Sequence, residues 1–153
     1  MIEQHQLNEH NKREYPPMHT AEHILNQTMM RMFGCKRAVE AHIERKKSKC
    51  DYELLQQPTE QQIQDIENKV NEIILQDLPV WVDYTTQQEA IRQFDLTRLP
   101  ENASEELRIV HIGDYDACPC LGIHVERTAQ IGRVKILSWS YCYPRLRLRF
   151  RLD

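Results

Sequence analysis

Glycine is scarce in this sequence, with four residues in a chain of 153. Neither of the two common glycine-rich phosphate-binding patterns, GxGxxG and GxxxxGK[ST], occurs, so nucleotide-binding enzymes of those two kinds are not expected. The mean hydropathy of -0.66 and the 28% of charged residues exclude a membrane protein. What remains is an ordinary globular protein with enough apolar residues, 41%, to build a core.

The cysteines do not form a disulfide framework, because there are five of them at irregular spacing. The first 17 residues are polar and lack the apolar stretch of a signal peptide. We therefore expect a reducing, cytoplasmic location. The length predicts one domain, with residues 1–17 as a polar lead-in segment and residues 18–153 as the domain.

Apolar residues fall at helical spacing in two stretches. The first begins at Met18 and stops before Gly34, and the second follows Thr59 and Gln62, which have the spacing of a capping box. Thr86 with Glu89 predicts the start of a short third helix. Between the first and second predicted helices, residues 38–56 contain short pieces in which apolar and polar residues alternate. This pattern predicts a β-hairpin.

Further strands are expected at residues 78–84, 107–112, 133–140 and 145–152, with a polar loop at 95–106 and a turn-rich segment at 113–122. The last strand alternates strictly between arginine and apolar residues, which is typical of a strand with one buried face. Helices and strands mix without a regular βαβ rhythm. The sequence therefore predicts an α+β fold with a mostly antiparallel sheet and helices packed on one side.

Two pairs of residues have a spacing that suits metal binding. His19 and His23 lie four apart on the first predicted helix, so both imidazoles project from one face. Cys120 and His124 repeat that spacing in the turn-rich segment. Nitrogen and sulfur ligands of this kind favour zinc. Cys118 is the competing sulfur ligand, and we expect it to be structural or to lie behind the ligands.

The residues around both pairs resemble a known family. His19-Thr20-Ala21-Glu22-His23-Ile24-Leu25 resembles the HTAxHLL motif of alanyl-tRNA synthetase editing domains, and residues 112–125 resemble the segment that carries their CGGTH motif. The similarity extends, in the same order, to residues 78–80 and 127–136. The chain thus resembles the threonyl/alanyl-tRNA synthetase second additional domain. It is too short for a synthetase, so it looks like a free-standing, trans-editing member.

The resemblance implies a reaction and a ligand set. The reaction is hydrolysis of the ester between a wrong amino acid and the terminal adenosine of tRNA, with Ser- or Gly-tRNA(Ala) as the expected substrate. The family's four motif residues hold zinc, and they carry over to His19, His23, Cys120 and His124. We expect His19, His23 and His124 to serve catalysis as well.

Two departures from the family motif leave alternatives open. Family CGGTH reads here Cys120-Leu121-Gly122-Ile123-His124, so a glycine has become leucine and the threonine has become isoleucine. This form is closer to the CxGPH of threonyl-tRNA synthetase editing domains. The alternatives are therefore a Ser-tRNA(Thr) deacylase of threonyl type, or a diverged, non-catalytic module that keeps the metal for folding and binds tRNA or a protein.

Basic residues gather in two stretches although the net charge is -3. Seven lie between Arg31 and Lys49, and six between Thr128 and Leu152, where no acidic residue occurs. Cations of this kind bind RNA phosphates. The residues expected to contact the tRNA acceptor end are Arg45, Lys46, Lys47, Lys49, Arg133 and Lys135. We expect neither DNA nor a membrane as partner. The arginine row of the last strand fits RNA contact or a solvated edge that blocks aggregation.

For other polar and aromatic residues, the sequence predicts less specific roles. Glu22, Asp116 and Glu126 are near the ligands in sequence and are candidates for orienting the imidazoles. His42 and His111 are candidates for lining the pocket. The two tryptophans, Trp81 and Trp139, are most simply core residues, and the alternative for either is stacking on a terminal base.

Overall fold

The computed structural model describes residues 15–96 and 105–153. Most of the predicted lead-in segment and of the predicted 95–106 loop lies outside these residues. The first described helix, α2 (Pro16–Phe33), begins inside the segment predicted as lead-in. Its first turn holds Pro16 and Pro17, which fit there because the first N–H groups of a helix have no intrahelical partner.

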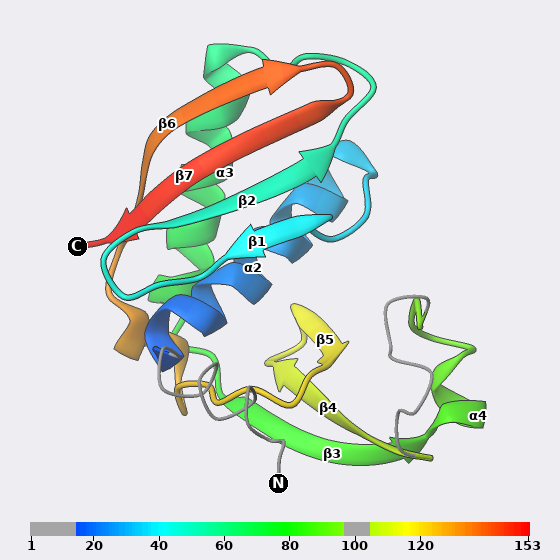
Figure 1. Cartoon of the computed structure of the whole chain (residues 1–153). Coiled ribbons are helices and arrows are strands. Elements are labelled where there is room, and N and C mark those ends of the chain that lie inside the picture. The colour runs from blue at the N-terminus through cyan, green and yellow to red at the C-terminus, as the bar shows by residue number, and fades with distance from the viewer. Residues whose placement is uncertain (1–14, 97–104) are drawn as a thin grey trace, which may run out of the picture.

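A four-stranded antiparallel sheet forms one layer of the domain (Figure 1). Its strands, in spatial order, are β1 (Glu40–His42), β2 (Ser48–Glu53), β7 (Arg145–Leu152) and β6 (Val134–Cys142). Helices α2 and α3 (Glu60–Leu75) cover the same face of this sheet. The predicted hairpin at 38–56 is thus confirmed as β1 and β2.

A second antiparallel sheet lies beside α2, separate from the first (Figure 1). Its strands are β3 (Val80–Thr86), β4 (Glu106–Ile112) and β5 (Asp116–Pro119), in the order β3-β4-β5. The short helix α4 (Gln87–Ala90) follows β3, and a 3-10 turn, η1 (Thr128–Ile131), precedes β6. The sequence did not predict β5, because this edge strand is short and ends at Pro119, which cannot donate to a neighbouring strand.

The core lies between the four-stranded sheet and the two long helices. Leu146, Leu148 and Phe150 of β7 are fully buried and point toward the helices, while the arginines between them lie on the other face. The α+β class, the antiparallel pairing and the helices on one side are therefore confirmed. The division of the strands into two sheets is new, since periodicity does not say which strands pair.

Both predicted capping residues are confirmed. The Thr59 hydroxyl accepts from the Gln62 N–H at 3.1 Å, and the Gln62 side chain accepts from the Thr59 N–H at 2.9 Å. At α4, the Thr86 hydroxyl accepts from the Glu89 N–H at 3.1 Å. These bonds satisfy backbone donors that a helix start leaves without a partner.

The prediction that Trp81 belongs to the core is wrong. Its side chain is 45% exposed on the small sheet, whereas Trp139 packs against the main core. Among the described residues, no long helix packs on the Trp81 face of the small sheet, so this apolar strand residue stays in contact with solvent. Within the described residues, no helix combines the length and apolarity needed to cross a membrane.

Candidate metal centre

The two histidines and the Cys120–His124 segment meet at the junction between α2 and the small sheet. His19 and His23 lie one turn apart on α2. The segment that carries Cys120 and His124 follows β5 without regular structure. It is fixed by Arg108 of β4, whose guanidinium donates to the carbonyls of Cys120 at 2.8 Å and Gly122 at 2.9 Å.

The four predicted ligands form one compact group. One donor atom each of His19, His23, Cys120 and His124 lies within 4.8 Å of the others. The Cys120 sulfur is 3.6 Å from Nε2 of His19 and 3.6 Å from Nε2 of His124. A tetrahedral zinc ion with bonds of about 2.3 Å to sulfur and about 2.0–2.1 Å to nitrogen separates sulfur from nitrogen by about 3.6 Å. The donor set and its spacing therefore fit zinc.

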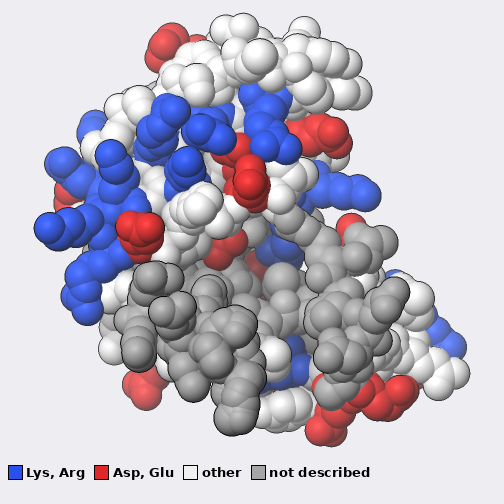
Figure 2. Space-filling view, in the orientation of Figure 1, with Lys and Arg blue, Asp and Glu red and all other residues white. Residues whose placement is uncertain are grey.

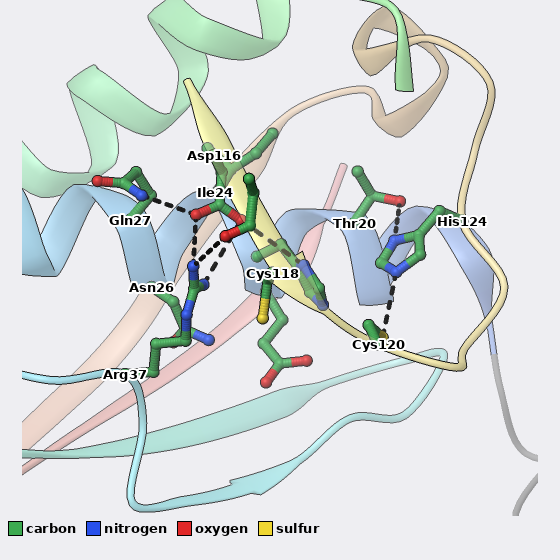
Figure 3. Close-up of polar contacts among 12 residues, drawn as sticks. Thr20, Ile24, Asn26, Gln27, Arg37, Asp116, Cys118, Cys120 and His124 are labelled. Atoms are coloured by element: carbon green, nitrogen blue, oxygen red, sulfur yellow. Dashed lines mark hydrogen bonds and ion pairs between the residues drawn. The ribbon is translucent and has the colours of Figure 1, made fainter. Parts of the chain in front are cut away.

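The hydroxyl of Thr20 determines which nitrogen of His124 faces the group (Figure 3). This oxygen donates to the Pro16 carbonyl at 3.1 Å and accepts from the Val125 N–H at 3.1 Å. Its contact with His124 Nδ1 at 2.9 Å must then be a bond that it accepts. Nδ1 of His124 carries the proton, and Nε2 is left with a lone pair directed to Cys120. Burial and the neighbouring imidazoles lower the pKa of His124 to about 4.

Asp116 of β5 lies behind His23. His23 is buried, and its Nδ1 lies 3.7 Å from the Asp116 carboxylate without a hydrogen-bond partner. The carboxylate is held by Arg37 at 2.7 Å and by Gln27 at 2.7 Å (Figure 3). Burial raises the pKa of Asp116, but His23 and Arg37 outweigh it and lower the pKa to about 2. Asp116 is therefore an anion beside Nδ1 of His23, and its role in orienting that ring stays a prediction.

The two neighbouring thiols differ in their electrostatic surroundings. Burial raises the pKa of the Cys120 thiol, but contacts with His124, His19 and His23 lower it to about 3. The Gly122 N–H also donates to this sulfur at 3.3 Å. Burial raises the pKa of Cys118, whose thiol contacts the Pro119 carbonyl at 3.4 Å and lies outside the group of four. Cys120 is the thiolate of the site.

The site can be reached from solvent. The His19 side chain keeps 16% of its area exposed, and Leu121 and Ile123, which flank the ligand loop, are 88% and 58% exposed. We call these two apolar residues, which lie between Cys120 and His124 in the sequence, the rim of the candidate metal site. A separate cavity of about 400 Å³ lies between α3 and β6, and its lining includes none of the four ligands.

Several other candidates lie away from the centre. Glu22 remains beside His19, at 3.8 Å, but Glu126 is exposed and holds β3 through its backbone. His42 is exposed on β1, and His111 stacks on Trp81 with ring centroids 3.8 Å apart. The sequence reasoning missed Thr20, Arg37 and Arg108 as supports. Only Thr20 carried a signal, because it lies inside the first motif.

The six basic residues predicted to contact RNA fall into two groups. The first is the turn of the β1–β2 hairpin, where the Arg45 guanidinium lies 4.2 Å from the centre of the Tyr15 ring. Tyr15 is the N-cap residue of α2, so the turn lies beside the helix end that carries His19. Arg133 and Lys135 form the second group, near the start of β6, where Arg133 lies 3.8 Å from Glu67.

This fold and this centre define an α+β domain with a His₃Cys donor set of the kind that binds zinc. Residues 107–147 match the family described as "Threonyl and Alanyl tRNA synthetase second additional domain". The alanine--tRNA ligase of Frankia alni is 33% identical over 139 residues, which cover 90% of this chain and 16% of that protein. The same ligase of Fervidobacterium nodosum is 31% identical over 138 residues, with the same coverage of both chains.

A third alanine--tRNA ligase, from Caldicellulosiruptor saccharolyticus, is 35% identical over 124 residues, or 80% of this chain and 14% of that protein. The chain thus spans about a sixth of the length of these relatives. The matched family segment contains Cys120 and His124, and the longer alignments cover most of the domain. The chain is a threonyl/alanyl-tRNA synthetase second additional domain.

Proposed function

We propose that this chain hydrolyses mischarged aminoacyl-tRNA in trans, with Ser- or Gly-tRNA(Ala) as substrate and with zinc in the His₃Cys centre. The observation that carries the proposal is the convergence of four metal-ligand side chains from segments about 100 residues apart. They converge in a chain that belongs to the second additional domain family. The reaction places the protein in the cytoplasm, with the tRNA acceptor end as partner.

His19, His23, Cys120 and His124 would hold the zinc ion, which when bound polarises a carbonyl and lowers the pKa of a bound water to about 7. The other residues prepare these ligands. The Thr20 hydroxyl keeps the proton of His124 on Nδ1, and Asp116 faces Nδ1 of His23. Arg108 fixes the carbonyls of the Cys120–His124 segment, so both ligands of that segment keep their positions without substrate.

The acceptor end would approach along the hairpin turn. Arg45, Lys46 and Lys47 are exposed, and Arg45 lies against Tyr15 at the end of α2 that carries His19. Cations at this place bind the phosphates next to the terminal adenosine while the ester reaches the centre. Leu121 and Ile123 then contact the amino acid or the adenosine from the rim.

Two features favour second candidates. The sequence Cys120-Leu121-Gly122-Ile123-His124 is closer to the CxGPH motif of threonyl-tRNA synthetase editing domains than to CGGTH, which favours Ser-tRNA(Thr) as an alternative substrate. Four protein ligands are typical of a structural zinc site, whereas catalytic zinc usually keeps an open position. This second feature favours a non-catalytic module that binds tRNA and uses the metal for folding.

The deciding experiment measures deacylation of Ser-tRNA(Ala), Gly-tRNA(Ala) and Ser-tRNA(Thr) by purified, zinc-loaded protein. The variants His19→Ala and Cys120→Ala test the centre. His111→Ala is the matched control, because this histidine lies on β4 outside the centre. We expect hydrolysis of one substrate that both centre variants lose and the control keeps. No hydrolysis of any of the three by folded, zinc-loaded protein would contradict the proposal and favour the binding module.

A further inference from the structure

The outer face of the four-stranded sheet, opposite α2 and α3, is rich in basic side chains (Figure 2). Strand β7 places an arginine at every second position on this face, and the neighbouring strands add lysines beside them. The basic residues of the face are Lys49, Lys135, Arg145, Arg147, Arg149 and Arg151. This density contrasts with the net charge of -3 of the whole chain.

The position of β7 removes the simplest explanation of its arginine row. Charged residues on an edge strand prevent pairing with another sheet. However, β7 is a central strand that pairs with β2 on one side and with β6 on the other. Its arginines therefore do not protect an edge.

Two cross-strand pairs on this face bring like charges together. Lys49 of β2 lies opposite Arg149, and Lys135 of β6 lies opposite Arg151. Like charges in directly opposite positions destabilise a sheet. Among the described residues, Lys49, Lys135 and Arg149 form no ion pair, and Arg149 donates to the Ser138 hydroxyl at 3.3 Å. A face selected for stability alone would alternate the signs of its charges.

The other end of the face is neutralised. The buried carboxylate of Asp51 accepts from Arg147 at 2.8 and 3.0 Å and from Arg145 at 3.3 Å. Positive charge without such a partner is concentrated at the end where β2 begins. We name Lys49, Lys135, Arg149 and Arg151 at this end the sheet-face cluster. Arg151 also pairs with Asp153 at 2.8 Å.

This end of the sheet continues into the hairpin turn. Lys49 is the second residue of β2, directly after the turn that holds Arg45, Lys46 and Lys47. Arg45 in turn lies against Tyr15 at the start of α2. The basic residues of the hairpin turn therefore lie between the sheet-face cluster and the start of α2.

We propose that the sheet-face cluster binds the sugar–phosphate backbone of the tRNA body, beyond the acceptor end. This inference rests on the proposed function for the identity of the RNA. Guanidinium groups bind phosphate oxygens in a planar, two-point geometry, which suits a row of arginines. The face carries Ser138 and Ser140 between the cations, in place of the aromatic anchors of a protein interface or the apolar side chains that enter a membrane.

The test compares binding of uncharged tRNA(Ala) by the parent and by a double variant with Arg149→Gln and Arg151→Gln, the two residues of the cluster that are not also expected to contact the acceptor end. Lys69→Gln is the matched control, because this partly exposed lysine lies on α3, on the other side of the sheet. Affinity is measured by fluorescence anisotropy across a salt series, and deacylation of a mischarged acceptor minihelix is measured in parallel. Thermal unfolding checks the fold, which removal of like-charge pairs should leave intact.

We expect the double variant to bind whole tRNA about tenfold more weakly and with a shallower salt dependence. The log–log slope should fall by about 0.9 for each phosphate that the variant no longer neutralises. The variant should still deacylate the minihelix, which separates this inference from the proposed function. Tight tRNA binding by the parent without any deacylation would support the sheet-face cluster as an RNA-binding surface and contradict the proposed hydrolase activity.

Equal tRNA affinity of parent, variant and control would overturn the inference. It would also be overturned if the double variant kept its tRNA affinity and instead stopped binding anionic phospholipid vesicles. The single variant Arg149→Gln repeats the test with the smallest change.

Discussion

The Thr20 hydroxyl accepts a hydrogen bond from His124 Nδ1 at 2.9 Å, across 104 positions of sequence. The same oxygen joins the start of α2 to the backbone of Val125. One buried threonine thus connects the two halves of the metal centre. Because it accepts from Nδ1 of His124, we expect Thr20 to influence metal affinity without touching the metal.

Replacement of Thr20 by valine should weaken zinc binding about 10–100-fold, since His124 loses the partner that fixes its ring. The change is nearly isosteric, so the helix should form. Affinity is measured by competition with a chromophoric chelator. Thr28→Val is the matched control, because the Thr28 hydroxyl is also buried on α2 but bonds Ile24 and Tyr115. Equal zinc affinity of the two variants would contradict the role of Thr20.

The two thiols of the Cys118–Cys120 segment should behave differently toward metal. Cys120→Ser should lose the bound metal, because Cys120 is the thiolate within 3.6 Å of two imidazoles. Cys118→Ser should keep it. Metal content by mass spectrometry, and the sulfur-to-metal charge-transfer band after cobalt substitution, give the readout. A band that persists in Cys120→Ser and disappears in Cys118→Ser would exchange the two assignments.

The sequence was sufficient for those elements whose signal is local. The helix caps at Thr59 and Thr86, the alternation of β7 and the helical spacing of α2 and α3 each depend on residues within a few positions of one another. The sequence could not predict features that depend on contacts between distant segments. These are the split into two sheets, the exposure of Trp81, and the hydrogen bonds by which Arg37 and Arg108 hold residues around the candidate site. The four candidate ligands were paired by local spacing and grouped into one site by their zinc-like chemistry, and the family resemblance supported that grouping. The structure then showed that Thr20 contacts His124.

Asn71 joins α3 to the start of β6 by two hydrogen bonds. Its side chain donates to the Val134 carbonyl at 2.9 Å and accepts from the Val134 N–H at 2.8 Å. Asn71→Ala should lower the free energy of unfolding by about 1–3 kcal/mol, because both backbone groups lose their partner in a buried place. Urea denaturation measures the loss. Asn68→Ala, on the exposed side of the same helix, should change stability by less than about 0.5 kcal/mol.

The stability of the sheet should depend on pH through Asp51. Hydrogen bonds from Arg147 lower the pKa of this carboxyl from its ordinary value of 3.8. The unfolded chain therefore takes up the proton first as pH falls, so the stabilisation is complete above the ordinary pKa and is lost as pH falls through the folded value. Asp51→Asn should destabilise the protein by about 1.5–3 kcal/mol at pH 7 and by much less near pH 2.

The control for this pH dependence is Asp65→Asn, since Asp65 is an exposed carboxylate on α3 that accepts only from Gln61 in the described contacts. It should leave stability within about 0.5 kcal/mol at both pH values. Urea denaturation of parent and both variants at pH 7 and near pH 2 supplies the comparison. A stability difference for Asp51→Asn that stays constant between the two pH values would show that packing, and not charge, is what the variant removes.

Leu121 should contribute to substrate binding and not to the metal centre. Its side chain is 88% exposed beside Cys120, so nothing in the folded chain accounts for a leucine there. Leu121→Ala should raise KM for the mischarged tRNA about tenfold, because one truncated apolar contact in a binding pocket is worth about 1–3 kcal/mol. Zinc content and kcat should stay unchanged. Leu55→Ala, 77% exposed after β2, should alter neither constant. An unchanged KM for Leu121→Ala would mean that the rim does not contact the substrate, and an altered kcat would place Leu121 against the reacting ester.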